Sequence, residues 1–365
     1  MARVGLVFGG RSVEHLVSVQ SARTVAAGLE AGGHTVVPLG IAEDGCWVDE
    51  VTSQRALGGE LRSLSPAGPS PGMGLRHFLE AKVEVVFPIV HGTFGEDGTL
   101  QGLCELLDLP YVGAGVAASA LAMDKLLCKR ALEAAGVPVV EYATIHVRDT
   151  EATTSERLAD LESYGMPLFV KPSVGGSSVG VQRVGARSEL GRAVEQAMRF
   201  HDVVLVERGV KGRELECAVL GNRRLEASVI GEIVPGRDFY DYEDKYLGDT
   251  AQLIAPADLP ENVARELRTM AVRAFEAIGG EGMARVDFFL EGEKLYVNEI
   301  NTLPGFTSIS MYPRLWGLSG LPLPQLIDRL VGLALERHAD RRAYDDSVRS
   351  WVHELEVRLT ASASS

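Results

Sequence analysis

The 365-residue sequence has few cysteines, and they are widely separated. No two of them form a CxxC pair, and none clusters with histidine. This distribution predicts neither a disulfide framework nor a zinc site, and it is typical of a protein in a reducing compartment. We therefore expect a cytoplasmic protein. The four cysteines are Cys46, Cys104, Cys128 and Cys217.

The sequence also lacks long hydrophobic runs and an excess of basic residues. No apolar run approaches the ~18 residues that a membrane-spanning helix requires. The short run Val4–Phe8 ends at Gly9-Gly10, which is typical of a strand entering a turn rather than of a signal peptide. With 36 Lys and Arg against 50 Asp and Glu, the net charge is −14. A nucleic-acid-binding protein needs a basic face, so we expect neither nucleic acid nor membrane as a partner.

Short apolar runs alternate with helical patterns over residues 1–118, and this alternation predicts an open parallel α/β domain. Over residues 119–210, strand, glycine-rich loop and strand follow one another closely, which favours an antiparallel sheet. The expected strands of these two segments are Arg3–Phe8, Val36–Ile41, Val83–Ile89, Leu168–Lys171, Gly180–Val184 and Val203–Glu207. The expected helices are Ser18–Ala31, Leu100–Leu107, Asp124–Ala135 and Ser188–Phe200.

Residues 211–340 form a third predicted segment, and residues 341–365 a helical tail. The third segment contains a helix at Glu261–Ile278, a hairpin at Met283–Glu299 and a helix from Leu323 to about Arg337. In the tail, apolar residues at helical spacing predict a last helix that packs on the body, followed by disorder at Ala361–Ser365. Those apolar residues are Val348, Val352, Leu355 and Leu359.

The clearest chemical motif is a glycine- and serine-rich loop that follows a lysine. A predicted strand delivers Lys171, and the loop Gly175–Gly180 comes next. Glycine and serine let backbone N–H groups approach an anion closely, so the motif predicts a phosphate-binding loop. It is not a Walker A loop, because the lysine precedes the glycines. The alternative is a flexible hairpin without a ligand, and the adjoining lysine favours phosphate.

A second motif lies on the predicted hairpin near residue 290. With a three-residue loop at Gly292–Lys294, Asp287 sits opposite Glu299 and Arg285 sits opposite Asn301. Two carboxylates and an amide then converge, and such hard oxygen ligands suit Mg²⁺ that bridges substrate phosphates. A solvated outer face is the alternative. On the first strand of the hairpin, alternation is expected to place Arg285, Asp287 and Phe289 on the same face. On the second strand it is expected to place Leu295, Val297, Glu299 and Asn301 on one face.

Three further loops are candidates for the site. Glu14 follows a glycine pair after the first strand, and His91 opens a glycine-containing loop after a later one. Such loops lie at the carboxyl ends of parallel strands, where these sheets bind ligands. The alternatives are a favourable helix-start charge for Glu14 and a structural loop histidine for His91. The aromatic and charged stretch Asp238–Tyr246 predicts an ordered surface loop or a lid.

Six motifs, taken together and in this order, resemble those of the D-alanine–D-alanine ligases of the ATP-grasp superfamily. The resemblance runs from Val4 to about Leu335. The motifs are Gly9-Gly10…Glu14-His15…Val17-Ser18, His91-Gly92…Gly95-Glu96-Asp97-Gly98, Met123-Asp124-Lys125, Lys171-Pro172…Gly176-Ser177-Ser178-Val179-Gly180, Tyr240-Asp241-Tyr242…Lys245-Tyr246, and Arg285-Val286-Asp287…Asn298-Glu299-Ile300-Asn301…Gly305.

The resemblance implies an ATP-grasp fold of the α/β class, which is α+β when the whole chain is considered. An N-terminal open parallel α/β domain is followed along the chain by two α+β domains that sandwich ATP. It implies a carbon–nitrogen ligase that joins two D-alanines in peptidoglycan precursor synthesis. ATP passes its γ-phosphoryl to the first D-alanine, and the amine of the second attacks the acyl phosphate. The implied partners are D-alanine, ATP and a second copy of the chain in a homodimer.

The resemblance also assigns roles to residues. ATP contacts are implied for Lys125, Lys171, Ser178, Glu207, Glu214, Lys245 and Phe289. Two Mg²⁺ ions, for which Mn²⁺ can substitute, are implied at Asp287, Glu299 and Asn301. Arg285 and the Gly305 N–H are implied to face the oxyanion of the intermediate. Glu14 with Ser177 and Tyr246, and also His91, are implied at the first substrate, and Ser310 at the second.

One departure from the family pattern is Leu16, which stands where members commonly have a second glutamate. It removes a charge beside the first-substrate pocket while Glu14 is retained. Two rival functions remain open: a sister ligase that uses D-lactate or D-serine, and a nucleotide-binding regulator without activity. Tyr246 favours D-alanine over the first rival, and the presence of Arg285, Asp287, Glu299 and Asn301 argues against the second.

Overall fold

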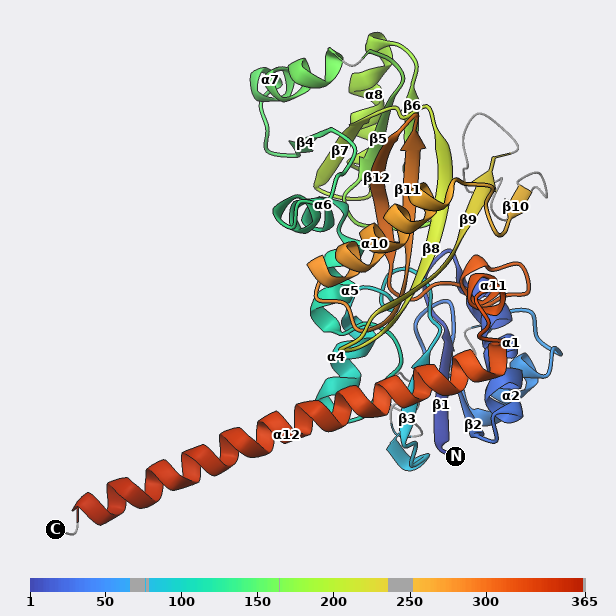
Figure 1. Cartoon of the computed structure of the whole chain (residues 1–365), viewed down its shortest axis with the longest axis vertical. Helices are drawn as coiled ribbons and strands as arrows, with labels where there is room; N and C mark the ends of the chain where they lie inside the picture. The colour runs from blue at the N-terminus through green and yellow to red at the C-terminus, as the bar shows by residue number, and fades with distance from the viewer. Residues whose placement is uncertain (66–75, 77–78, 164, 236–251, 364–365) are drawn as a thin grey trace.

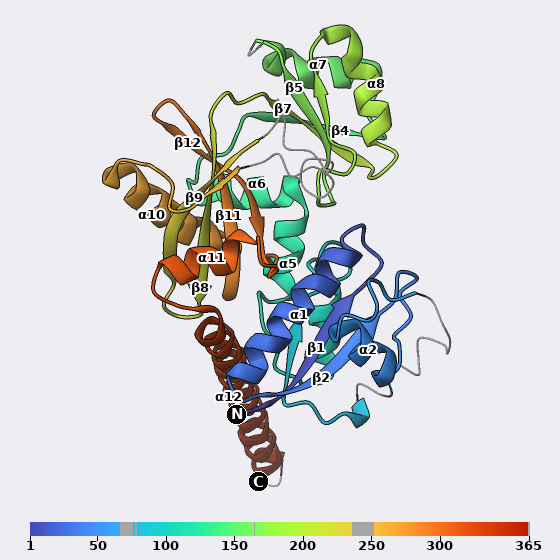
Figure 2. The same ribbon diagram turned by 90° about the vertical axis from the view of Figure 1, so that its right-hand side faces the viewer.

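The computed structural model describes residues 1–65, 76, 79–163, 165–235 and 252–363. The predicted lid Asp238–Tyr246, with Lys245 and Tyr246, therefore lies outside the described residues. Three sheets form three lobes, which Figure 2 shows side by side. The α/β architecture with one parallel and two antiparallel sheets agrees with the predicted fold class.

The N-terminal lobe is built on a three-stranded parallel sheet with the order β2-β1-β3. The central strand β1 is apolar throughout, and its residues Val4 to Phe8 are buried because both faces of the sheet are covered. The strands are β1 (Arg3–Gly9), β2 (Thr35–Ile41) and β3 (Val85–Pro88). The helices of this lobe are α1 (His15–Ala31), α2 (Glu50–Leu57) and α4 (Thr99–Leu106).

The second lobe is a four-stranded antiparallel sheet with the order β4-β7-β5-β6. Helices α7 and α8 pack their apolar sides against it. The strands are β4 (Tyr142–His146), β5 (Leu168–Pro172), β6 (Gln182–Val184) and β7 (Val203–Arg208). The helices are α5 (Val116–Met123) and α6 (Lys125–Ala134) on the approach, then α7 (Glu151–Glu162) and α8 (Arg187–Ala197).

The third lobe is a five-stranded antiparallel sheet with the order β10-β9-β8-β11-β12. Helix α10 covers one face with a buried stripe that includes Leu267, Met270 and Phe275, at the spacing of an amphipathic helix. The opposite face is shared between the site and helix α11, which packs on β8 and β9. The elements are β8 (Arg213–Gly221), β9 (Glu226–Val234), β10 (Gln252–Ile254), α10 (Glu261–Ala277), β11 (Gly282–Glu291), β12 (Lys294–Asn301) and α11 (Met311–Leu318).

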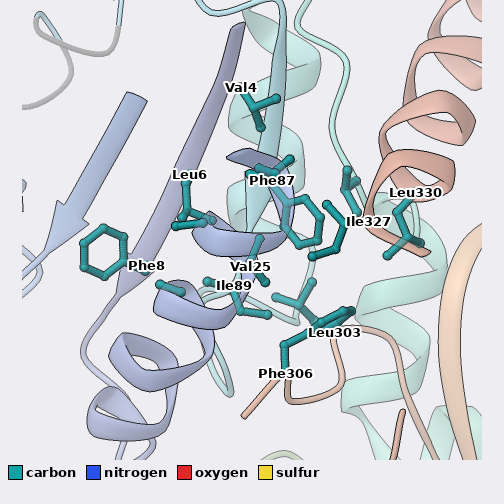
Figure 3. Packing of buried hydrophobic residues seen from close by; sticks show 14 of the residues in the cluster. Val4, Leu6, Phe8, Val25, Phe87, Ile89, Leu303, Phe306, Ile327 and Leu330 are labelled. Carbon is teal, nitrogen blue, oxygen red and sulfur yellow. The ribbon is translucent and has the colours of Figure 1, made fainter. Parts of the chain in front are cut away.

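After β12 the chain returns to the N-terminal lobe and shares its core. Leu303 and Phe306 pack in one apolar cluster with Leu6 and Phe87, as Figure 3 shows. The rings of Phe87 and Phe306 meet edge to face at 6.0 Å between centroids. This packing places the loop that follows β12 beside the loops of the parallel sheet, although more than two hundred residues separate them in the chain.

The C-terminal helix differs from the prediction. Helix α12 (Leu323–Ala363) is one continuous element whose second half projects away from the body (Figure 1). The tail residues Val348, Val352, Leu355 and Leu359 are 60%, 40%, 40% and 61% exposed, so the predicted packing of a last helix on the body is wrong. The expected disorder at Ala361–Ser365 is wrong for residues 361–363, which continue the helix, and residues 364–365 lie outside the described residues. No glycine or proline follows Gly332, so the sequence carries no stop signal for the helix.

None of the helices within the described residues is both long enough and apolar enough to cross a membrane.

Candidate active site

The two loops of the parallel sheet meet at one edge. The Ser12 hydroxyl donates a hydrogen bond to the His91 carbonyl at 2.6 Å, which ties the loop carrying Glu14 to the loop after β3. Ser18 in α1 reinforces the junction, since its hydroxyl donates to the Ile89 carbonyl at 2.5 Å. Because parallel strands end at the same edge of the sheet, Glu14 and His91 come together there, as the sequence predicted.

His91 is buried and fully engaged. Its Nδ1 lies 3.1 Å from the Leu303 carbonyl and 3.4 Å from a Glu96 carboxylate oxygen, and its Nε2 lies 3.1 Å from the Ser21 hydroxyl. Burial alone would lower the pKa of His91, but Glu96 and then Glu14 outweigh it and raise the pKa. The pKa of Glu96 is also raised, in this case by burial itself. His91 and Glu96 therefore form a buried pair in the wall of the site.

The glycine- and serine-rich loop has an unusual backbone. Ser177 and Ser178 have φ values of 51° and 59°, a left-handed conformation that costs about 1–3 kcal/mol for a residue with a side chain. Lys125 at the start of α6 donates from its Nζ to the Gly175 carbonyl at 2.5 Å. Burial lowers the pKa of Lys125, although Glu299 opposes the shift. Residues 176–178 of the loop, Lys125 and Lys171 thus line one cavity.

Glu207 on β7 holds two lysines. Its carboxylate lies 2.7 Å from the Lys171 ammonium and 3.2 Å from the Lys129 ammonium, and Glu207 is 3% exposed. Burial would raise the pKa of Glu207, but the charges of Lys129 and Lys171 outweigh it and lower the pKa to about 2. Burial lowers the pKa of Lys129. Sequence reasoning missed Lys129, which lies in a helical pattern that gives no sign of a buried partner.

Glu207→Gln is expected to lower the free energy of unfolding at pH 7 by about 3–5 kcal/mol, because it leaves a buried lysine without its anion. The pKa of Glu207 is lowered from about 4.5 to about 2 in the folded chain. Its stabilisation is therefore complete above pH 4.5 and is lost as the pH falls toward 2. Urea unfolding at pH 7 and pH 4 should show the gap to wild type narrowing at the lower pH.

The exposed Glu266 of α10 supplies the control for this measurement. Glu266→Gln should change the free energy of unfolding by no more than about 0.5 kcal/mol at either pH. Equal stability of Glu207→Gln and wild type at pH 7 would contradict the structural importance of the buried ion pair.

The hairpin of β11 and β12 confirms the predicted register at the site but not its predicted turn. Asp287 pairs with Glu299 and Arg285 pairs with Asn301, as expected. The turn, however, contains two residues, Gly292-Glu293, since Glu291 pairs with Lys294. A bulge restores the register, because Phe288 pairs with Val297 and leaves Asn298 as an extra residue.

The bulge also corrects the predicted faces of β12. Leu295 and Val297 were expected to share a face with Glu299, but both are packed in the core under α10. The extra residue Asn298 reverses the alternation, so that Glu299 and Asn301 turn to the side of Asp287. The carboxylates and the amide reach the site because of this irregularity.

Arg285 organises the acidic cluster. Its Nε and Nη2 donate to the two carboxylate oxygens of Asp287, both at 2.7 Å, and its Nε lies 3.2 Å from Glu216. The Asn301 amide donates to Asp287 at 3.0 Å. Burial alone would lower the pKa of Arg285, but Asp287 and Glu216 raise it well above its usual value. The guanidinium therefore remains charged and fixed in the site.

The oxygen donors suit Mg²⁺ that is shared with phosphates. Asp287, Glu299 and Asn301 supply carboxylate and amide oxygens from neighbouring positions of β11 and β12. Among the described residues no group of three or more His, Cys, Asp or Glu could hold a metal by itself. Mg²⁺ typically binds through one or two carboxylates plus substrate phosphates, so the donor set fits that ion.

Glu216 is a site residue that sequence reasoning missed. It lies on β8 opposite Asp287, is 3% exposed and contacts Arg285. The signal was present, because Glu214 and Glu216 alternate on one strand and strand alternation gives them the same face.

The loop after β12 is closely packed around Gly305. The Thr307 N–H donates to the Ser310 hydroxyl at 2.9 Å, and the Thr307 and Ser310 hydroxyls lie 2.8 Å apart. A Cβ added at Gly305 would lie 2.8 Å from the Ser310 hydroxyl oxygen, which is closer than real side chains approach. A side chain at position 305 would therefore displace Ser310.

The resemblance implies that Ser310 binds the second substrate, so we expect Gly305→Ala to raise the KM for that amino acid about tenfold or more, since overpacking of this kind costs about 1–3 kcal/mol. Steady-state kinetics with ATP saturating would measure it. Gly317→Ala in α11 is the matched control, because no heavy atom lies within 4 Å of the added Cβ. A raised KM for ATP with an unchanged KM for the amino acid would contradict the role of Ser310.

Two adjoining cavities collect the predicted residues into one cleft. The first holds the ATP-site candidates, and the second holds the amino-acid-site candidates. The shared wall includes Ser177, Arg285 and Glu299. The predicted residues in the first are Lys125, Lys171, Ser177, Ser178, Glu207, Glu214, Arg285, Asp287, Phe289 and Glu299. Those in the second are Glu14, His91, Ser177, Arg285, Glu299, Asn301, Gly305 and Ser310.

Family comparisons cover most of the chain. The family described as "D-ala D-ala ligase N-terminus" matches residues 3–114, and "D-ala D-ala ligase C-terminus" matches residues 131–332. The D-alanine–D-alanine ligase of Solibacter usitatus is 46% identical over 342 residues, which cover 93% of this chain and 97% of that protein. D-alanine–D-alanine ligase A of Salmonella typhimurium is 45% identical over 358 residues, which cover 93% of this chain and 98% of that protein.

Solved structures give the same result. The D-alanine–D-alanine ligase from Coxiella burnetii superposes with a TM-score of 0.79 at 38% identity and covers 95% of this chain and 99% of its own. The VanG D-Ala:D-Ser ligase from Enterococcus faecalis superposes with a TM-score of 0.77 at 32% identity and covers 91% of this chain and 99% of its own.

Proposed function

The chain belongs to the D-alanine–D-alanine ligase family and is an ATP-dependent ligase that joins two D-alanines for cell-wall synthesis, and we propose how its residues carry out this reaction. The observation that carries the proposal is the pair of adjoining cavities, whose shared wall holds Ser177, Arg285 and Glu299. Molecules bound in the two cavities would meet at these shared residues, so that binding lowers the entropic cost of bringing the reacting groups together.

In the first step ATP occupies the cavity of the glycine- and serine-rich loop. Lys125, Lys171 and Ser178 hold its phosphates, joined by Lys245. Glu207 binds the adenine amino group, Glu214 the ribose hydroxyls, and Phe289 lines the pocket. A carboxylate oxygen of the first D-alanine forms a bond to the γ-phosphorus, and the bond to the bridging oxygen of ADP breaks. Such a transfer requires positioning and charge neutralisation rather than a covalent nucleophile.

Asp287, Glu299 and Asn301 are proposed to hold two Mg²⁺ ions, for which Mn²⁺ can substitute. When bound, these ions would neutralise charge on the phosphates. The protein's part is to fix the donors, and the Arg285 fork and the Asn301 amide already hold the Asp287 carboxylate in place.

In the second step the amine of the second D-alanine attacks the acyl phosphate. The new carbon–nitrogen bond forms a tetrahedral intermediate, and its collapse expels phosphate and leaves the dipeptide. Arg285 and the Gly305 N–H stabilise the oxyanion, and Ser310 binds the carboxylate of the second substrate. Glu14 accepts the ammonium of the first D-alanine, with Ser177 and Tyr246 as its hydrogen-bond partners and His91 beside it.

Phosphate release with D-alanine as the sole amino acid tests the proposal. We expect release that depends on ATP and D-alanine, with D-alanyl-D-alanine as the product. The similarity to the VanG D-Ala:D-Ser ligase makes a D-serine product the second candidate, so D-serine and D-lactate are added as competitors across a range of pH. A competitor used tenfold better than D-alanine would overturn the choice of second substrate, and no phosphate release would overturn the reaction.

We further propose a homodimer that works in the cytoplasm. The four cysteines are free, and three of them are buried, as suits a reducing compartment. Sedimentation equilibrium of the full chain would measure the number of copies.

A further inference from the structure

A buried lysine adjoins the nucleotide cavity without forming part of it. Lys129 on α6 is 2% exposed, and lysine is rarely buried so deeply. Its Nζ lies 3.2 Å from Oε1 of Glu207, donates a hydrogen bond to the Val140 carbonyl at 3.2 Å, and lies 5.2 Å from the centre of the Tyr142 ring. A buried ion pair seldom adds net stability compared with apolar residues of the same size, so the pair favours a functional role for Lys129.

Glu207 has two lysine partners, and they lie on different sides of it. Lys171 lies 2.7 Å from Oε2 and lines the first cavity together with Glu207. Lys129 is on the other carboxylate oxygen and lines neither of the two cavities of the cleft. A nucleotide bound in the first cavity can therefore touch Glu207 and Lys171, whereas Lys129 acts only through Glu207.

The sheet fixes the backbone of Glu207 and leaves its carboxylate to the lysines. Glu207 belongs to β7, where it pairs with Tyr142 of β4 on one side and with Phe169 of β5 on the other. The two ammonium groups, one at each carboxylate oxygen, hold the carboxylate between them. Without Lys129, the carboxylate would be held from the cavity side alone and would follow Lys171.

The charges of the three side chains give each lysine a separate task. Glu207 carries one negative charge and the lysines two positive charges, so one positive charge remains for a phosphate. If Lys129 were absent, Glu207 would neutralise Lys171, which is proposed to hold phosphates of ATP. Lys129 also keeps Glu207 ionised: burial would raise the pKa of Glu207, and the charge of Lys129 is the largest of the effects that lower it to about 2. An ionised carboxylate accepts hydrogen bonds from an amino group and donates none.

We propose that Lys129 is a positioning residue for ATP, which balances the charge of Glu207 from behind and holds its carboxylate toward the adenine amino group. The charge of Lys171 is then available to the phosphates. This role rests on the proposed contact between Glu207 and adenine, and Lys129 itself makes no contact with the nucleotide. A purely structural lysine would affect the stability of the chain but not its choice of nucleotide.

Steady-state kinetics of Lys129→Met, with D-alanine saturating, test the effect on ATP. The KM for ATP should rise about tenfold, which is the usual size of a lost hydrogen bond to a charged group. The kcat should stay within about twofold of the wild-type value, because binding rather than chemistry is impaired. Lys294→Met is the matched control: Lys294 is exposed beside the turn of the β11–β12 hairpin, outside both cavities, and its variant should match wild type. An unchanged KM for ATP, or a fall in kcat alone, would overturn the role.

A nucleotide without the amino group makes the test specific. Purine riboside triphosphate lacks only the 6-amino group of ATP, so it offers no amino group to Glu207. Wild type and Lys294→Met should have a kcat/KM for ATP about tenfold or more above that for the analogue, as expected for one hydrogen bond to a charged acceptor. Lys129→Met should lose most of this preference.

Lys129→Gln shortens the side chain and removes the charge but keeps an N–H for the Val140 carbonyl, so it repeats the test if Lys129→Met fails to fold. A wild-type preference for ATP in either folded variant would overturn the role of Lys129 while leaving the adenine contact of Glu207 intact. No preference in the wild type would overturn the adenine contact itself, and the role of Lys129 with it. In both cases phosphate release with ATP and D-alanine would still show that the ligase reaction is intact.

Discussion

Glu299→Gln is expected to lower the rate of ATP-dependent phosphate release by about a thousandfold while the chain folds normally. The change keeps the size of the side chain but removes one of the two carboxylates that meet across β11 and β12. Phosphoryl transfer depends on neutralised phosphate charge, and ~4 kcal/mol of lost transition-state stabilisation corresponds to ~10³-fold in rate. Coupled measurement of ADP and phosphate, at low and high Mg²⁺, would record the loss.

Two further measurements make this expectation specific. Glu293→Gln changes the same residue type on the same hairpin, at the exposed turn and outside both cavities, and should release phosphate at the wild-type rate. ATP binding to Glu299→Gln by calorimetry should lose most of its dependence on Mg²⁺. Turnover near that of wild type would show that Glu299 is not a metal ligand. The acidic cluster would then have only a structural role, as a network of ion pairs.

The acidic cluster on β11 and β12 was predicted only in part from the sequence. Asp287 and Glu299 face each other as predicted, yet the predicted turn was one residue too long and the bulge at Asn298 was not foreseen. The shorter turn shifts the pairing by one residue and the bulge shifts it back, so the predicted pairing of Asp287 with Glu299 is still correct. Local alternation cannot reveal a bulge, because Leu295 and Val297 look compatible with either face until the core under α10 selects one.

Long-range pairing accounts for the other omissions. The strands of the parallel sheet could be predicted because full burial leaves a continuous apolar run, as in β1. Lys129 could not be predicted, because its importance rests on a partner far away in the chain, Glu207. Strand alternation with Glu214 indicated the face of Glu216, but not its contact with Arg285. The tail of α12 shows the same limit: helical spacing predicted a helix, but spacing does not specify what covers its apolar side.

Arg285→Lys is expected to lower kcat by about 10²–10³-fold, with a much smaller change in the KM for ATP. Arginine presents a planar fork, and here both arms are engaged by Asp287 at 2.7 Å while Nε also reaches Glu216. Lysine keeps the positive charge but cannot make the bidentate contact or hold the same geometry. If the guanidinium stabilises the oxyanion, losing its placement removes about 2.7–4 kcal/mol from the transition state and little from bound ATP.

A second arginine on the same sheet separates this effect from the loss of an ion pair. Arg213 makes an equivalent bidentate contact with Glu232, at 2.7 and 2.6 Å, outside both cavities. Arg213→Lys should therefore leave kcat near the wild-type value and change stability by no more than about 1 kcal/mol. Both variants break a bidentate pair with a carboxylate, but only Arg285 of the two lines the cavities. Equal kcat values for Arg285→Lys and Arg213→Lys would show that Arg285 takes no part in the reaction and serves only as a structural partner of Asp287.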